Sequence, residues 1–179
     1  ATETEVDKEL VTATHHKIPN RVLAECMRGN MIQAGAPEFT AEEHEKAKAI
    51  QKELGQPETG LPEEIEPFEG GYTVLCDTPE YSWNAPYASA WIAMGMKECG
   101  WHHWGVTRCA GDTMGQKSMD CAAKVISMTA AELMCNPDIV AHAQEEWRER
   151  MEGKVYKSLL ADEMQPPVHL NEDVMKRYR

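Results

Sequence analysis

Two short stretches of this sequence gather side chains that are able to do chemistry. The first, residues 76–84, carries two carboxylates, Asp77 and Glu80, with Ser82 and Trp83 close behind them. A pair of carboxylates can act as general acid and base, orient a histidine or bind a cation. Turn chemistry is the competing interpretation, because Asp-Thr-Pro is a common way to begin a tight turn.

The second stretch, residues 100–104, sets two adjacent histidines between two tryptophans. Imidazole is the commonest metal ligand, and the neighbouring indoles would exclude water from a bound ion. In an extended segment successive side chains point in opposite directions, so only one of His102 and His103 can ligate a given ion. A structural histidine between two tryptophans is an equally good interpretation. A local zinc site built from Cys99, His102 and Cys109 fits no standard finger spacing.

Bulk composition narrows the function classes. The chain has 179 residues, 42% of them hydrophobic and 27% charged, which is enough for one globular domain with its own core. A net charge of −12 repels phosphate backbones, so we expect no nucleic-acid partner. The acidic first ten residues do not resemble a signal peptide, and the apolar runs are too short to span a bilayer. We therefore expect a cytoplasmic protein with no membrane partner, and reduced cysteines.

Helix-start and helix-stop signals predict the elements around these stretches. Asn20 is a good N-cap for a helix that ends near Gly35. The capping-box pattern Thr40-Ala41-Glu42-Glu43 predicts a second, surface helix that stops at Gly55. Residues 55–71 are rich in proline, glycine and glutamate, which predicts a long acidic loop.

The second half of the chain predicts two further helices. One covers residues 114–134, and Asn136-Pro137-Asp138 predicts the start of the other, which ends at Gly153. The first of these helices carries an apolar stripe. The stripe comprises Met119, Ala122, Ala123, Ile126, Ala130, Leu133 and Met134.

Strands are predicted at three places between the helices. β-branched and apolar runs indicate strands over residues 8–16, 72–76 and 105–109. The alternation of strands with helices predicts the α/β class, a sheet flanked by helices. Ligands of such sheets bind at the carboxyl ends of the strands, where Asp77 and Glu80 would then lie.

Four stretches of the sequence each resemble one motif, and the four motifs occur in the same order along the chain. Residues 18–23 are similar to L-P-N-R-x-L, and residues 76–83 to S-T-D-V-G-D-V-S-W. Residues 100–104 are similar to P-x-H-[ST]-W, and residues 114–119 to I-G-H-K-G-M. With these four in register, the chain resembles the C-terminal portion of the aminobenzoyl-glutamate utilisation protein B family of zinc amidohydrolases and carboxypeptidases.

The match to these motifs is uneven. Asp77, Ser82 and Trp83 agree with the second motif, whereas Glu80 stands where the family has Asp. Gln116 replaces the histidine of the fourth motif. Because of these differences from the motifs, a degenerate relative of the family is one possible interpretation of the chain.

The resemblance implies a domain organisation. Members have a catalytic α/β domain with paired metals, interrupted by a smaller α+β lid domain used for dimerisation. Residues 1–19 would be the last strand of the lid domain, residues 20–165 the C-terminal part of the zinc-exopeptidase-like catalytic domain, and residues 166–179 a tail.

The resemblance also implies a reaction. The family hydrolyses a small-molecule amide such as p-aminobenzoyl-glutamate or a related N-acyl amino acid, with two metal ions, zinc or manganese. His102 would be a metal ligand. The residues expected to line or brace the substrate pocket are Asp77, Glu80, Ser82, Trp83 and His103.

The other ligands and the general base of the family have no counterpart in this sequence. A catalytic zinc needs about three protein ligands, so His102 alone cannot hold one. We therefore expect a partner that completes the site, either the N-terminal part of the same enzyme or another subunit, in a homo- or hetero-oligomer. The alternative is a non-catalytic interaction module that retains the family fold.

Overall fold

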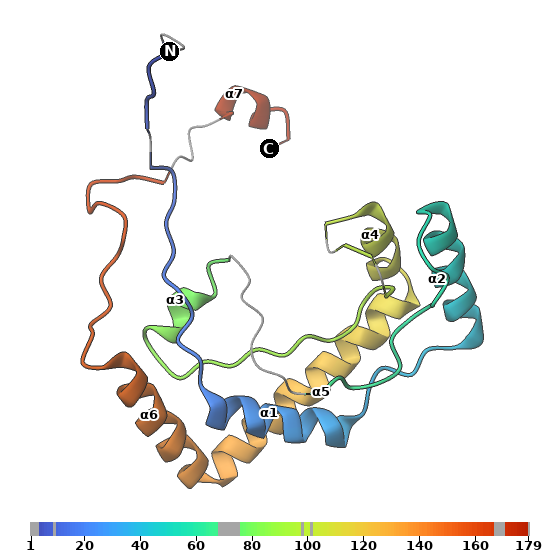
Figure 1. The fold of residues 1–179 in the computed structure, drawn as a ribbon, viewed down its shortest axis with the longest axis horizontal. Helices are drawn as coiled ribbons and strands as arrows, with labels where there is room; N and C mark the ends of the chain where they lie inside the picture. Colours follow the sequence, from blue (N-terminus) through green and yellow to red (C-terminus); the bar gives the residue numbers. More distant parts are fainter. Residues whose placement is uncertain are drawn as a thin grey trace.

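The computed structural model describes residues 4–8, 10–67, 76–97, 99–100, 102–166 and 171–178. These residues form helices and contain no β-strand, so the predicted α/β fold, a sheet flanked by helices, is wrong for this part of the chain (Figure 1). The helices are α1 (Arg21–Ala34), α2 (Ala41–Glu53), α3 (Pro79–Ser82), α4 (Trp104–Ala110), α5 (Thr113–Cys135), α6 (Pro137–Met151) and α7 (Glu172–Met175). None of these helices combines the length and apolar character needed to cross a membrane.

The three strand predictions have different outcomes. The 105–109 strand is wrong, because this run lies within α4. The described part of the 8–16 segment has no regular secondary structure, so that strand is also wrong. The 72–76 strand falls almost wholly outside the described residues.

Helix α4 forms because of local contacts that hydropathy does not reveal. The imidazole of His103 caps its N-terminus by accepting a hydrogen bond from the Gly105 N–H at 3.2 Å. Gly105 also lets the helix pack closely, since a Cβ there would lie 2.9 Å from Met96 Cε and 3.1 Å from Leu54 Cδ1. This short apolar run is thus helical because its N-terminus is capped and because Gly105 allows neighbouring side chains to pack closely against it.

The capping signals of the first two helices are confirmed. Asn20 caps α1 by accepting a hydrogen bond from the Leu23 N–H at 2.9 Å, and Gly35 ends the helix with φ of 80°. Thr40 and Glu43 form the predicted capping box at the start of α2. These signals depend on residues within one turn of each other, which is why the sequence alone locates the helix ends.

Helix α5 spans the predicted range, but its apolar stripe is not its buried face. Met119, Ile126 and Met134 are 65%, 62% and 86% exposed. The buried face instead comprises Met114, Ser118, Cys121, Val125 and Thr129. The hydroxyls of Ser118 and Thr129 donate to the carbonyl oxygens of Met114 and Val125, one turn earlier, so these polar side chains are buried without losing their hydrogen bonds.

Two small cores hold the helices together. Helix α1 packs on α5 and α6, and α4 packs on both α2 and α5 (Figure 1). The first core lies among α2, α4 and the start of α5, and consists of Ala47, Leu61, Met96, Cys109 and Met114. The second core joins the N-terminal segment to α3 and α6, and consists of Ile18, Trp83 and Met151 with Trp147 packed against it.

A buried carboxylate ties α2 to α5. Glu43 is 3% exposed, and its carboxylate accepts hydrogen bonds from Lys117 Nζ at 2.7 Å, Thr113 Oγ1 at 2.5 Å and the Thr40 N–H at 2.7 Å. Burial alone would raise the pKa of Glu43, but these bonds and the Lys117 charge lower it to about 2. The carboxylate is therefore ionised at neutral pH and is paired where it is buried.

A half-buried thiol lies where α1 meets α5. All six cysteines are free, and Cys26 on α1 points its Sγ at Glu132 Oε2, 3.4 Å away on α5. The amide of Asn30 donates to the same carboxylate oxygen at 2.5 Å. Burial, followed by the hydrogen bond and negative charge of Glu132, raises the pKa of the Cys26 thiol to about 11.

Candidate functional site

The first predicted stretch forms helix α3 and the turn before it. Glu80 on α3 faces the N-terminal segment, where its carboxylate accepts the His15 N–H at 2.5 Å and lies 3.0 Å from His15 Nδ1. Tyr156 also donates its hydroxyl to Glu80. Burial alone would raise the pKa of Glu80, but the hydrogen bonds from His15 and Tyr156 lower it. Glu80 is thus an ionised anchor for the N-terminal segment.

Aromatic rings complete this anchor. The His15 ring lies against Trp83 with centroids 4.4 Å apart and an interplanar angle of 40°. The ring of Tyr156 also lies near His15, with the two centroids 5.4 Å apart. The Trp83 indole N–H donates to the His16 carbonyl at 2.8 Å. Trp83 is 9% exposed, so its ring is a packed part of the second core.

Ser82 lies at the centre of the same junction. Its hydroxyl accepts the Ile18 N–H at 2.8 Å and donates to the Pro79 carbonyl at 2.5 Å. The Trp147 indole N–H of α6 donates to the Ser82 carbonyl at 2.7 Å. We name His15, Ile18, Glu80, Ser82 and Trp83 the α3 latch, because together they fasten the N-terminal segment to α3.

Asp77 belongs to the turn before α3 but not to the latch. Its carbonyl accepts the Glu80 N–H at 3.0 Å, which closes the turn, and its side chain is exposed. The turn interpretation of this stretch is therefore confirmed for Asp77. The structure brings Glu80, Ser82 and Trp83 together as structural residues, and leaves the Asp77 carboxylate facing solvent.

The second predicted stretch lies apart from the first. Figure 1 shows α3 and the start of α4 in separate parts of the molecule. His103 uses its Nδ1 to cap α4, whereas the side chain of His102 is exposed. Trp104 is 50% exposed, and Trp101 lies outside the described residues. His102 is the member of this stretch whose imidazole is available to a ligand.

The residues present do not by themselves fit a catalytic metal. Such a site needs about three protein ligands. Over the described ranges no group of three or more His, Cys, Asp or Glu side chains is placed to hold a metal ion. Cys99, His102 and Cys109 accordingly do not form the local site considered from the sequence: Cys109 is fully buried in the first core, and His102 is exposed.

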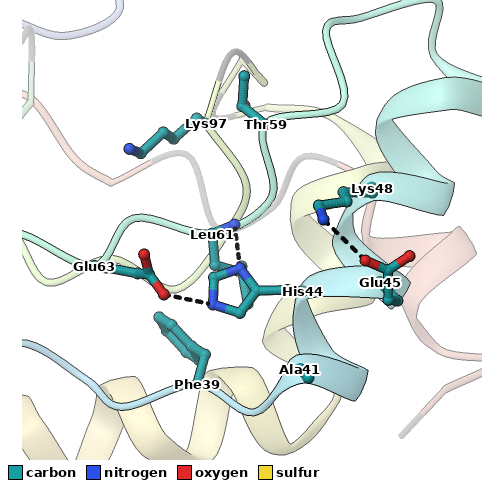
Figure 2. Close-up of a pocket in the computed structure, with 9 residues that line it drawn as sticks. All are labelled: Phe39, Ala41, His44, Glu45, Lys48, Thr59, Leu61, Glu63 and Lys97. Carbon is teal, nitrogen blue, oxygen red and sulfur yellow. Dashed lines mark hydrogen bonds and ion pairs between the residues drawn. The ribbon is translucent and has the colours of Figure 1, made fainter.

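A pocket that the motif analysis missed lies between α2 and the acidic loop. Its volume is about 510 Å³. It is lined by Phe39, Ala41, His44, Glu45, Lys48, Thr59, Leu61, Glu63 and Lys97, as Figure 2 shows. The side-chain amide of Gln51 shapes it by accepting the Gly60 N–H at 2.8 Å and donating to the Lys97 carbonyl at 2.9 Å.

His44 is the polar centre of this pocket (Figure 2). Its Nδ1 accepts the Leu61 N–H at 3.3 Å, so in the neutral ring the proton belongs to Nε2. The Nε2 atom lies 3.1 Å from Glu63 Oε1, but it is buried and makes no well-aligned hydrogen bond within the described structure. The only sequence signal for this pairing was the glutamate-rich loop, which did not single out His44.

The pocket offers charged groups of both signs. Lys48 is paired with Glu45 at 2.8 Å, and His44 faces Glu63. Phe39 packs edge-on against the His44 ring with centroids 6.2 Å apart. Such a pocket can hold a small polar molecule, but its carboxylates and cations are largely matched to each other.

Comparison with known proteins relates the chain to a hydrolase. It is 24% identical, over 183 aligned residues, to a curated p-aminobenzoyl-glutamate hydrolase subunit of Escherichia coli (strain K12). The alignment covers 87% of this chain and 38% of the relative, so the chain spans well under half of the relative's length. No protein-family model and no solved structure matches the chain. The comparison therefore supports a distant relationship to a hydrolase subunit.

Proposed function

We propose that this chain is one part of a hydrolase that cleaves small-molecule amides of the p-aminobenzoyl-glutamate type. The observation that carries the proposal is the similarity to a hydrolase subunit over 87% of the chain. The four ordered motifs of the sequence support the same assignment. Because the chain covers 38% of that relative, we propose that further polypeptide, in the same protein or in a partner subunit, completes the active site.

In the completed enzyme we assign His102 as a metal ligand, with zinc or manganese as the metal. The exposed imidazole at the start of α4 supports this assignment, because it can be reached by groups from outside the described residues. The exposed Asp77 carboxylate is assigned to the substrate side of the site. Glu80, Ser82 and Trp83 are assigned a positioning role, since their contacts hold the turn that carries Asp77.

A non-catalytic subunit is the second candidate. It is favoured by the α3 latch, in which three of the predicted substrate-pocket residues are engaged with the protein's own main chain. In this case the fold would be kept as an interaction module, and hydrolysis would belong to another subunit.

The test measures release of p-aminobenzoate from p-aminobenzoyl-glutamate by the full-length gene product or by the complex purified with this chain. We expect His102→Ala to lower hydrolysis by about 10²-fold or more and to lower bound zinc or manganese. His142→Ala is the matched control, because His142 is an exposed histidine on α6.

The outcomes separate the two candidates. Absence of hydrolysis in the assembled wild-type protein contradicts the hydrolase proposal and leaves the interaction module. Hydrolysis that survives His102→Ala with unchanged metal content keeps the hydrolase but removes His102 from the metal site.

A further inference from the structure

The pocket between α2 and the acidic loop, called the His44 pocket from here on, contains a buried hydrogen-bond donor without an acceptor. His44 Nδ1 accepts the Leu61 N–H, so in the neutral ring Nε2 carries the proton. Among the described residues, His44 Nε2 is the one buried side-chain nitrogen or oxygen that has no hydrogen-bond partner. Buried polar groups in folded proteins are nearly always paired, so an unpaired N–H in a pocket wall indicates a ligand that supplies the acceptor.

The charges of the His44 pocket indicate which acceptor this is. Lys97 lines the pocket and makes no ion pair with any described residue, whereas Lys48 is paired with Glu45 at 2.8 Å. An N–H donor beside an unpaired ammonium favours an acceptor that carries negative charge. A carboxylate meets both requirements, because its oxygens accept hydrogen bonds and its charge is attracted to Lys97.

The protein's own Glu63 already brings a carboxylate to His44. Glu63 Oε1 lies 3.1 Å from His44 Nε2, but the two groups are not aligned as a hydrogen bond (Figure 2). The side chain of Glu63 is 72% exposed. Because exposed ion pairs contribute little free energy, the carboxylate of a ligand can displace Glu63 at small cost.

The side of the His44 pocket next to the imidazole is apolar. Phe39 lies edge-on to the His44 ring, with the two centroids 6.2 Å apart, and Leu61 belongs to the first core. A ring or another apolar group of a ligand can therefore pack on Phe39 while its polar end reaches His44.

Backbone hydrogen bonds fix the walls of this pocket in advance. The fully buried side chain of Gln51 bonds to the main chain of Gly60 and Lys97, and the Lys97 N–H donates to the Gly60 carbonyl at 3.2 Å. Gly60 has φ of 76°, and a Cβ at this position would lie 2.9 Å from His44 Nδ1. Glycine thus lets the acidic loop close on the imidazole, and a ligand would meet a preformed site.

We propose that the His44 pocket binds a small carboxylate with an apolar body about the size of one ring. The ligand carboxylate accepts the His44 Nε2–H in place of Glu63 and pairs with Lys97, and the apolar body packs on Phe39. The volume of about 510 Å³ lies within the range of small-molecule pockets. This inference does not rest on the proposed hydrolase function.

Fluorine NMR of 4-fluorobenzoate tests the proposal, with the full-length gene product or the complex that contains this chain. A small molecule that binds a large protein shows faster transverse relaxation, so its affinity can be measured by titration. We expect a dissociation constant on the order of 1 mM. The neutral isostere 4-fluorobenzamide should bind at least about tenfold more weakly, because it lacks the charge that pairs with Lys97.

Two substitutions should change this affinity in opposite directions. Lys97→Gln should weaken binding of 4-fluorobenzoate at least about fivefold, because it removes the ammonium that pairs with the carboxylate. Glu63→Gln should tighten binding about threefold or more, because it removes the competing negative charge. Both side chains are exposed, so neither substitution disturbs the core. Lys52→Gln is the matched control, since Lys52 is an exposed lysine of α2 that does not line the pocket.

Opposite effects of Lys97→Gln and Glu63→Gln support the proposal, because a general loosening of the acidic loop would weaken binding in both variants. Absence of binding, equal affinity for the acid and the amide, or weaker binding in Glu63→Gln overturns it. An equal loss in Lys52→Gln also overturns it. Binding that is the same in wild type, Lys97→Gln and Glu63→Gln places the probe at another site and overturns it as well. Hydrolysis of p-aminobenzoyl-glutamate is a separate measurement, so either proposal can fail without the other.

Discussion

The α3 latch and the start of α4 contain the same kinds of residues in opposite situations. In the latch, Glu80 and Trp83 are fixed between histidine, tyrosine and main-chain groups. At the start of α4, His102 and Trp104 are exposed. The residue type alone therefore does not show whether a carboxylate, histidine or tryptophan has a functional role. Their neighbours decide whether they hold the fold or remain available to a ligand.

The two regions would affect the proposed function in different ways. Residues of the latch act on stability first, and on any reaction only through the turn that they hold. His102 contributes little to stability, so an effect of its removal on hydrolysis would report on the site itself. Measurements of stability on variants of the two regions test whether they differ in this way.

The largest effect is expected for Trp83→Ala. The ring is 9% exposed in the second core, and its removal leaves a cavity and an unpaired His16 carbonyl. We expect a loss of about 3–5 kcal/mol in the free energy of unfolding, measured by urea denaturation. Trp104→Ala is the control, and a loss as large as that of Trp83→Ala would erase the distinction between the regions.

Ser82→Ala is expected to have the next largest effect. It removes the acceptor of the buried Ile18 N–H and a donor to the Pro79 carbonyl. We expect a loss of about 1–3 kcal/mol in urea denaturation, because a buried donor is left unpaired. Ser127→Ala on the exposed face of α5 should change the same quantity by less than about 0.5 kcal/mol. Equal effects for the two serines would contradict the latch.

Glu80→Gln is expected to change the pH dependence of stability. The folded-state pKa of Glu80 is lowered, so its contribution is present above the unfolded pKa of about 4.3 and is lost as pH falls through the folded-state pKa. The stability difference between wild type and Glu80→Gln should therefore be largest near neutral pH and shrink below about pH 4. Urea midpoints measured from about pH 3 to about pH 7 check this, and a difference independent of pH would refute it.

The smallest effect is expected for His102→Ala. The side chain is exposed, so the free energy of unfolding should change by less than about 0.5 kcal/mol. His15→Ala is the informative counterpart, because it removes the ring between Glu80 and Trp83. Thermal melts measure the loss of stability in both variants. If the loss is larger for His102→Ala than for His15→Ala, the start of α4 has a structural role and the contrast with the α3 latch is wrong.

The sequence predicted the parts of this fold that depend on neighbours along the chain. Caps at Asn20 and Thr40, and the restart at Pro137, act within one helical turn, and the corresponding helix ends are confirmed. The wrong strand at 105–109 came from a short apolar run whose conformation is decided by the His103 cap and by packing at Gly105.

The candidate site was predictable only in part. Residue types pointed to Glu80, Ser82 and Trp83, but their roles depend on His15 and Ile18, more than 60 residues away in sequence. The buried face of α5 was missed because hydroxyls that bond to their own helix can be buried like apolar groups. His44 was missed for the same long-range reason, since its partners come from the acidic loop.

The half-buried thiol of Cys26 links the α1–α5 contact to a chemical reactivity that can be measured. Alkylating reagents react with thiolates, and a pKa of about 11 leaves very little thiolate at neutral pH. Cys135, at the end of α5, is exposed, whereas the Cys26 thiol is partly covered and bonded to Glu132, so separation of the two helices would raise its reactivity. The ratio of the two labelling rates would therefore change in any variant that loosens the contact between α1 and α5.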